Sequence, residues 1–151
     1  MEKREQIEHI YFFSSYNIEG ISTRYRGLYV LEKYGYTGYF DESECVFLGD
    51  MLKSEEEMSR LGKPDPTLFV KLLEPMGKDA KVMYVGDGIA DAVLVEKAKA
   101  LGFEGLLFLG VVSSSEDSNK LFTEYSKHGT DAILTDVNDI PYLFTHLGGN
   151  V

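Results

Sequence analysis

Two carboxylates stand four residues apart at the end of an apolar run, Val-Met-Tyr-Val-Gly-Asp-Gly-Ile-Ala-Asp at positions 82–91. The run predicts a buried parallel strand, and the residues after Gly88 have the periodicity of a helix. Asp87 is therefore expected at the carboxyl end of a strand, where open α/β sheets bind ligands, and Asp91 one helical turn later. Two such carboxylates repel each other unless a hard cation or a lysine lies between them. The spacing predicts Mg²⁺-assisted handling of a phosphate group.

A lysine precedes this segment on a rigid turn, Gly62-Lys63-Pro64-Asp65-Pro66. The two prolines keep the backbone extended and prevent a helix from beginning before Thr67. Lys63 is thereby presented just ahead of the next predicted helix. A lysine in that place could act as a point charge for a phosphate, or for an aspartyl phosphate as it forms.

The order Gly-Lys-Pro-Asp-Pro, helix, strand-Gly-Asp-x-x-x-Asp resembles the haloacid dehalogenase superfamily of phosphatases. The resemblance implies that Lys63 is the third motif of that family, and that Asp87 and Asp91 are its acidic fourth motif. The apolar segment 8–13 followed by Ser14 and Ser15 looks like the second motif, a hydroxyl that hydrogen-bonds the phosphoryl group. Ser14 is the first choice for this role and Ser15 the second.

The resemblance extends from about residue 7 to residue 147 and implies a Mg²⁺-dependent phosphomonoester hydrolase similar to phosphoglycolate-type phosphatases. Its substrate would be a small phosphorylated metabolite. In this interpretation Asp87 binds Mg²⁺, and Asp91 holds either the metal or Lys63. Ser14 grips the phosphoryl group, while Lys63 offsets the charge of nucleophile and phosphate.

The nucleophile of the family is missing, because no Asp-x-Asp occurs in the 151 residues. The nearest imitation is Asp50 after an apolar run, but its partner position is Leu52, and its place in the order matches a later, non-catalytic strand. The chain looks like a core that lacks the first catalytic strand and the cap domain after it, and we expect it to be inactive alone. The alternative is a non-catalytic subunit of this fold, or an anion- or phosphate-binding module.

The missing strand would lie in the middle of the sheet of such a family member, between the strands ending at Ser14 and Val85. Without it, two inner strands would expose unpaired backbone groups. We therefore expect a partner polypeptide or a second copy of the chain to complete the sheet. Rearrangement of the chain's own segments is a weaker alternative, because residues 1–7 are short and charged.

Composition indicates a globular chain of one domain, residues 1–151, with 44% apolar and 26% charged residues. The net charge of −10 argues against nucleic acid or an anionic membrane as a partner. The single Cys45 is interpreted as a core residue. No apolar run is long enough to span a bilayer and no signal peptide is evident, so a cytoplasmic location is expected.

The predicted elements alternate in type, which indicates an α/β fold: a Rossmann-like three-layer sandwich with a mainly parallel sheet. Residues 49–62 are interpreted as a solvated loop. Five tyrosines between residues 25 and 39 either pack a helix onto the sheet or face another chain. The predicted strands are 8–13, 44–48, 81–85, 105–109 and 131–134, and the predicted helices are 18–33, 67–76, 88–101, 116–128 and 137–146.

Overall fold

A computed structural model of the chain describes residues 12–14, 23–40, 43, 45–52 and 54–146. By its contacts the chain divides into two compact units, Met1–Gly62 and Lys63–Val151, which are described separately. The single domain predicted for residues 1–151 stays a prediction. Ser15 and residues 8–11 of the first predicted strand lie outside the described residues.

The first unit contains a parallel pair of strands, with Phe12 opposite Cys45 and Ser14 opposite Phe47. One face of the following helix packs Leu31 against Cys45 and Phe47, which are almost fully buried. The prediction that Cys45 is a core residue is thereby confirmed. The elements of this unit are β1 (Phe12–Ser14), α1 (Thr23–Lys33), β2 (Cys45–Phe47), α2 (Leu48–Met51) and α3 (Glu55–Leu61).

The predicted loop over residues 49–62 is wrong, because this segment forms most of α2 and all of α3. Ser54 begins α3 by accepting a hydrogen bond from the Glu57 backbone N–H at 3.1 Å. Ser-Glu-Glu-Glu is the Ser-x-x-Glu pattern of a helix N-terminus. Acidic residues in the first turn also stabilise a helix, because they interact with the positive end of its dipole. The three glutamates therefore support a helix that their charge had suggested was a solvated loop.

The tyrosines of α1 and the turn after it point to solvent rather than onto the sheet. The exposed fraction of these side chains runs from 50% to 73%. Lys33 lies over the rings of two of them, 5.8 Å from the centroid of Tyr29 and 5.7 Å from that of Tyr34. The interpretation that they pack the helix onto the sheet is therefore not supported. The five residues are Tyr25, Tyr29, Tyr34, Tyr36 and Tyr39.

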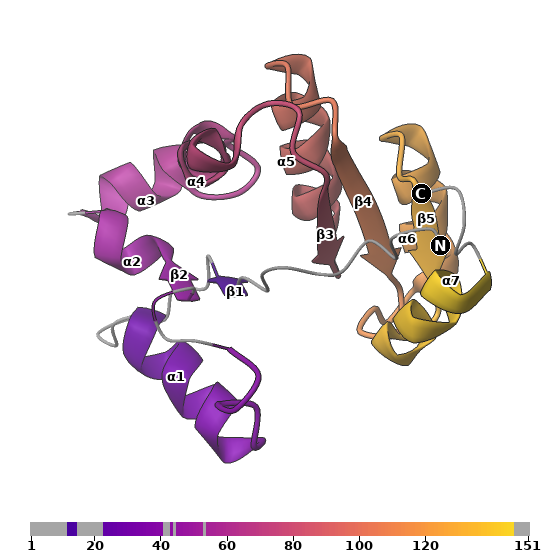
Figure 1. Ribbon diagram of the computed structural model, residues 1–151, viewed down its shortest axis with the longest axis horizontal. Helices are drawn as coiled ribbons and strands as arrows, with labels where there is room; N and C mark the ends of the chain where they lie inside the picture. Colours follow the sequence, from indigo (N-terminus) through magenta and orange to yellow (C-terminus); the bar gives the residue numbers. More distant parts are fainter. Residues whose placement is uncertain (1–11, 15–22, 41–42, 44, 53, 147–151) are drawn as a thin grey trace, which may run out of the picture. The chain divides into compact units, whose positions relative to one another are not determined.

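The second unit is built on a parallel three-stranded sheet in the order β3-β4-β5 (Figure 1). The register places Tyr84 opposite Phe108 and Gly86 opposite Gly110. A helix follows each of the first two strands and carries the chain back to the start of the next, as parallel pairing requires. The elements are α4 (Thr67–Leu73), η2 (Glu74–Met76), β3 (Val82–Gly86), α5 (Ile89–Ala100), β4 (Leu106–Val111), α6 (Ser118–Lys127), β5 (Ala132–Leu134), η3 (Val137–Asp139) and α7 (Ile140–His146).

Helices cover both faces of this sheet. On one face, an aromatic column links α4 to α6 through the strands, with ring-centroid distances of 5.2, 6.1 and 5.5 Å. Its members in order are Phe69, Tyr84, Phe108 and Tyr125. On the other face, Ile140 and Leu143 of α7 pack against Leu109, Val111 and Leu134. The predicted α/β fold with layers of helices around a parallel sheet is thereby confirmed for this unit.

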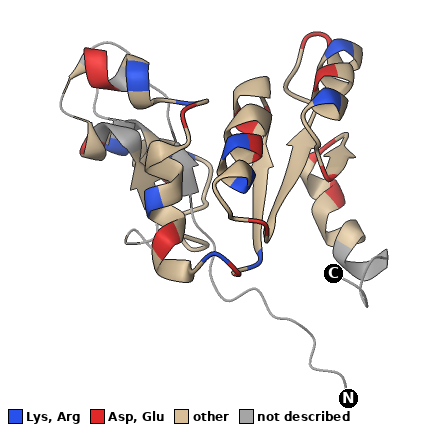
Figure 2. Cartoon of the chain, turned by 90° about the horizontal axis from the view of Figure 1, so that it is seen from above, with Lys and Arg blue, Asp and Glu red and all other residues tan. Residues whose placement is uncertain are grey.

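Charge is confined to the helices and the connecting segments of the second unit. Neither β3 nor β4 carries a lysine, arginine, aspartate or glutamate (Figure 2). For β4, in which five of six residues are buried, this is the continuous apolar composition of a strand covered on both faces. Within the described ranges, no helix is both long enough and apolar enough to cross a membrane.

Candidate functional site

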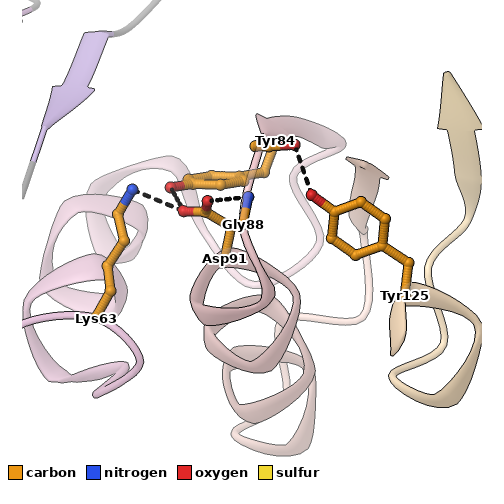
Figure 3. A network of polar contacts seen from close by, with 6 residues as sticks. Lys63, Tyr84, Gly88, Asp91 and Tyr125 are labelled. Atoms are coloured by element: carbon orange, nitrogen blue, oxygen red, sulfur yellow. Dashed lines mark hydrogen bonds and ion pairs between the residues drawn. The ribbon is translucent and has the colours of Figure 1, made fainter. Parts of the chain in front are cut away.

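Lys63 and Asp91 form an ion pair at the carboxyl end of β3 (Figure 3). The Lys63 Nζ atom lies 2.7 Å from Asp91 Oδ1, and the two side chains are 17% and 8% exposed. Prolines after Lys63 delay α4 until Thr67, whose N–H is bound by the Asp65 carboxylate at 2.9 Å. The proline-containing segment before α4 and the first turn of α5 therefore bring together two predicted site residues that are 28 positions apart.

Asp91 is also held by groups of its own strand and loop. Its Oδ1 atom accepts a hydrogen bond from the Tyr84 hydroxyl at 2.8 Å, and its Oδ2 atom accepts one from the Gly88 backbone N–H at 3.1 Å. Asp91 is the third residue of α5, so the Gly88 contact caps that helix. Both carboxylate oxygens thus have protein donors.

Glycine is required at the end of β3 because the Asp91 side chain approaches its backbone closely. A Cβ atom at Gly86 would lie 2.6 Å from the Asp91 Cβ and 2.9 Å from its Oδ2. These distances are well inside van der Waals contact. The glycine of the Gly-Asp sequence therefore has a structural reason, the close packing of Asp91, in addition to any chemical role of the segment.

Asp87 differs from Asp91 in its surroundings. It follows β3 directly, is exposed, and its carboxylate makes no hydrogen bond or ion pair with another described residue. Among the described residues, no cluster of three or more histidine, cysteine or acidic side chains could hold a metal ion. Asp87 is thus the carboxylate of this segment that remains open to an external ligand.

Two buried tyrosines lie at the same edge of the sheet. The Tyr125 hydroxyl is 3.4 Å from the backbone oxygens of both Gly86 and Val111, which bridges the ends of β3 and β4. Burial, reinforced by the negative charges of Asp91 and Asp87, raises the pKa of the Tyr84 and Tyr125 hydroxyls well above the usual value. Both hydroxyls therefore stay protonated and act as hydrogen-bond donors.

The hydroxyl predicted to bind phosphate lies in the other unit. Ser14 ends β1, which agrees with its predicted place at a strand end. Its convergence with Lys63, Asp87 and Asp91 stays a prediction, as does the choice between Ser14 and Ser15.

Asp50, the alternative nucleophile, does not directly follow a strand but lies within α2. Its Oδ2 atom is 2.6 Å from Arg24 Nε, and the Arg24 guanidinium lies 5.1 Å from the centroid of the Phe47 ring. The ion pair accounts for this aspartate without a catalytic role.

Sequence reasoning missed Tyr84 and Tyr125. A signal for Tyr84 was available, because residues two apart on a strand share a face. Tyr84 is the only polar side chain in β3, and it lies on the same face as Gly86, against which Asp91 packs. No comparable signal marked Tyr125, which comes from a helix 39 residues further along than Gly86.

Comparison with known proteins gives a likeness of fold. No protein-family model matches the sequence, and no curated protein matches it. A solved structure of a conserved haloacid dehalogenase-like protein of unknown function from Agrobacterium tumefaciens strain C58 is similar, with a TM-score of 0.62 and 18% sequence identity. The match covers 82% of this chain and 50% of that protein, so the chain spans about half the length of the protein it matches. The chain thus has an α/β fold that resembles part of a haloacid dehalogenase-like structure.

Proposed function

We propose that this chain supplies the Mg²⁺- and phosphate-binding end of a phosphomonoester hydrolase that resembles haloacid dehalogenase phosphatases. The observation that carries the proposal is the Lys63–Asp91 pair at the carboxyl end of β3, with Asp91 buried and Lys63 partly buried, together with the exposed Asp87 carboxylate, which has no partner among the described residues. Ligands of open α/β sheets bind at this end of the strands. The likeness of fold is compatible with this activity but does not carry it.

The roles of the two aspartates divide in this proposal. Asp87 would be the protein ligand of Mg²⁺, since this ion is commonly bound by one or two carboxylates together with waters and substrate phosphate. Asp91, whose oxygens already accept three hydrogen bonds, would hold Lys63, one of the two roles that the sequence left open. A bound Mg²⁺ would neutralise the charge of the phosphoryl group.

The charges of the proposed site support a role for a metal ion. One lysine against two carboxylates leaves a net negative charge, which repels a phosphate. Lys63 would stay anchored by Asp91 and extend its positive charge toward the phosphoryl oxygens. A small phosphorylated metabolite is the proposed substrate class, with Ser14 as the proposed hydroxyl donor.

Metal binding at Asp87 tests the proposal directly. Mn²⁺, which prefers oxygen ligands as Mg²⁺ does, is expected to broaden the amide signals of residues 86–88 in nuclear magnetic resonance spectra of the chain. Asp87→Asn should abolish this broadening. Asp79→Asn is the matched control, because Asp79 is an exposed carboxylate before the opposite end of β3. Equal broadening in wild type and Asp87→Asn would remove Asp87 from the metal site.

A non-catalytic role is the second candidate, favoured by the absence of Asp-x-Asp from the whole sequence. Such a subunit would bind metal and phosphate at Asp87 and Lys63 without hydrolysis, because no nucleophile would form the covalent intermediate. Phosphatase activity that appears when a second polypeptide supplies the missing aspartate would decide for the hydrolase.

We further propose that a partner polypeptide or a second copy of the chain adds a strand to β3. Among the described residues, β3 is hydrogen-bonded to β4 alone, and β3 has neither a charge nor a proline to protect its other edge. Val85 on this strand is 40% exposed. The opposite edge is formed by β5, which is only three residues long and is followed by the polar Thr135 and Asp136.

Light scattering coupled to size exclusion measures this assembly. A dimer, or a complex with a co-purified polypeptide, is expected rather than the 17.0 kDa monomer. Val85→Lys, which places a charge at an exposed position of β3, should weaken the association, as charged residues on edge strands do in natural sheets. A stable monomer of cooperatively folding protein would contradict the proposal.

A further inference from the structure

We propose that Tyr84 is a positioning residue of this site: its hydroxyl fixes Asp91, and through Asp91 it holds the Lys63 ammonium group in place. The inference rests on the proposed function in one respect, the phosphate-binding role assigned to Lys63. The contacts themselves belong to one compact unit, and they are drawn in Figure 3.

The Tyr84 hydroxyl and the Lys63 ammonium share one acceptor. Both donate to Asp91 Oδ1, at 2.8 and 2.7 Å, so that oxygen is fixed from two directions. The Gly88 N–H fixes the other oxygen at 3.1 Å. With Gly88 and Tyr84 both bound, the Asp91 carboxylate cannot rotate about its Cβ–Cγ bond without losing a hydrogen bond. The position of the carboxylate in turn determines the position of the Lys63 ammonium group that pairs with it.

The tyrosine is itself rigid, which a positioning residue must be. The residue is 9% exposed, and its ring lies in the aromatic column between Phe69 and Phe108, with centroid distances of 5.2 and 6.1 Å. The Lys63 Nζ atom lies 5.5 Å from the centroid of the same ring. Tyr84 therefore contacts the lysine with its ring and the carboxylate with its hydroxyl, whereas packing alone would require only the ring.

Tyr84→Phe separates these two contributions, because it removes the hydroxyl and keeps the ring. The measurement is the exchange of the Lys63 ammonium protons with water, observed by nuclear magnetic resonance in full-length, isotope-labelled chain. Exchange is expected to become several-fold faster in Tyr84→Phe, with Asp91→Asn as the upper limit. Tyr125→Phe is the matched control: it removes a buried hydroxyl at the same sheet edge that is bound to backbone oxygens rather than to Asp91.

Unchanged exchange of the Lys63 ammonium protons in Tyr84→Phe would show that Tyr84 contributes only the packing of its ring. Slower exchange would show that its hydroxyl competes with Lys63 for Asp91. Either result overturns the proposal. If Tyr84→Phe does not fold, the wild-type chain still gives a test, because a hydroxyl bound to a buried carboxylate exchanges its proton slowly. A Tyr84 hydroxyl proton that exchanges as fast as those of the exposed tyrosines would also overturn it.

The outcome is independent of the metal experiment. If Mn²⁺ fails to bind at Asp87 while Tyr84→Phe releases Lys63, the proposed function fails and the positioning role stands. If Mn²⁺ binds and Lys63 exchange is unaffected by Tyr84→Phe, the positioning role alone fails.

Discussion

Replacing Lys63 by methionine is expected to lower the free energy of unfolding by about 3 kcal/mol, because it leaves the charge of Asp91 without a counter-ion in a buried place. The Asp91 side chain is 8% exposed, so water cannot replace the ammonium group well. The donors from Tyr84 and Gly88 remain, which keeps the loss at the lower end of the range for broken buried pairs. Chemical denaturation of both proteins measures the difference.

Lys99→Met is the matched control for this substitution. Lys99 lies 2.8 Å from Asp131, with side chains that are 29% and 33% exposed, so solvent screens the pair. Asp131 also keeps its hydrogen bond from the Phe108 N–H at 2.7 Å. The loss should stay below about 1 kcal/mol. Equal losses in the two variants would show that burial of the Lys63–Asp91 pair has no energetic consequence.

The second large effect is a steep loss of stability in alkali. The folded chain holds the pKa of the Tyr84 and Tyr125 hydroxyls far above the usual 10.0, first through burial and then through the nearby carboxylates. The unfolded chain releases these protons above about pH 10, while the folded chain retains them. The stabilisation is therefore fully present below pH 10 and is lost as the pH rises further. Each hydroxyl contributes a loss of about 1.4 kcal/mol per pH unit.

Denaturation curves between pH 9 and pH 11 measure this slope. Tyr84→Phe and Tyr125→Phe should each remove one hydroxyl's share, whatever their effect on stability at neutral pH. Tyr39→Phe, at a side chain that is 73% exposed, is the control and should keep the wild-type slope. Near-ultraviolet absorbance should show that these two hydroxyls ionise only as the chain unfolds. A slope in Tyr84→Phe equal to that of wild type would contradict the prediction.

Local patterns in the sequence determined the elements of the second unit and two members of the candidate site. The apolar run before Gly86 and the helical spacing after Gly88 located β3 and α5 to within about one residue. The prolines after Lys63 placed the start of α4 at Thr67. Each signal depends only on neighbouring residues, which is why the sequence alone was sufficient for Lys63, Asp87 and Asp91 as candidates.

The tertiary structure decided what these residues do to one another. Asp91 is bound to Lys63 and Tyr84 because the strand pleat puts Tyr84 and Gly86 on one face, and the absence of a side chain at Gly86 lets α5 approach. The sequence left open whether Asp91 holds the metal or Lys63, since both Asp87 and Asp91 are aspartates near one strand end. Only the packing of α5 on β3 buries one carboxylate among donors and leaves the other exposed, because burial and hydrogen-bond partners arise from contacts between segments far apart in the chain.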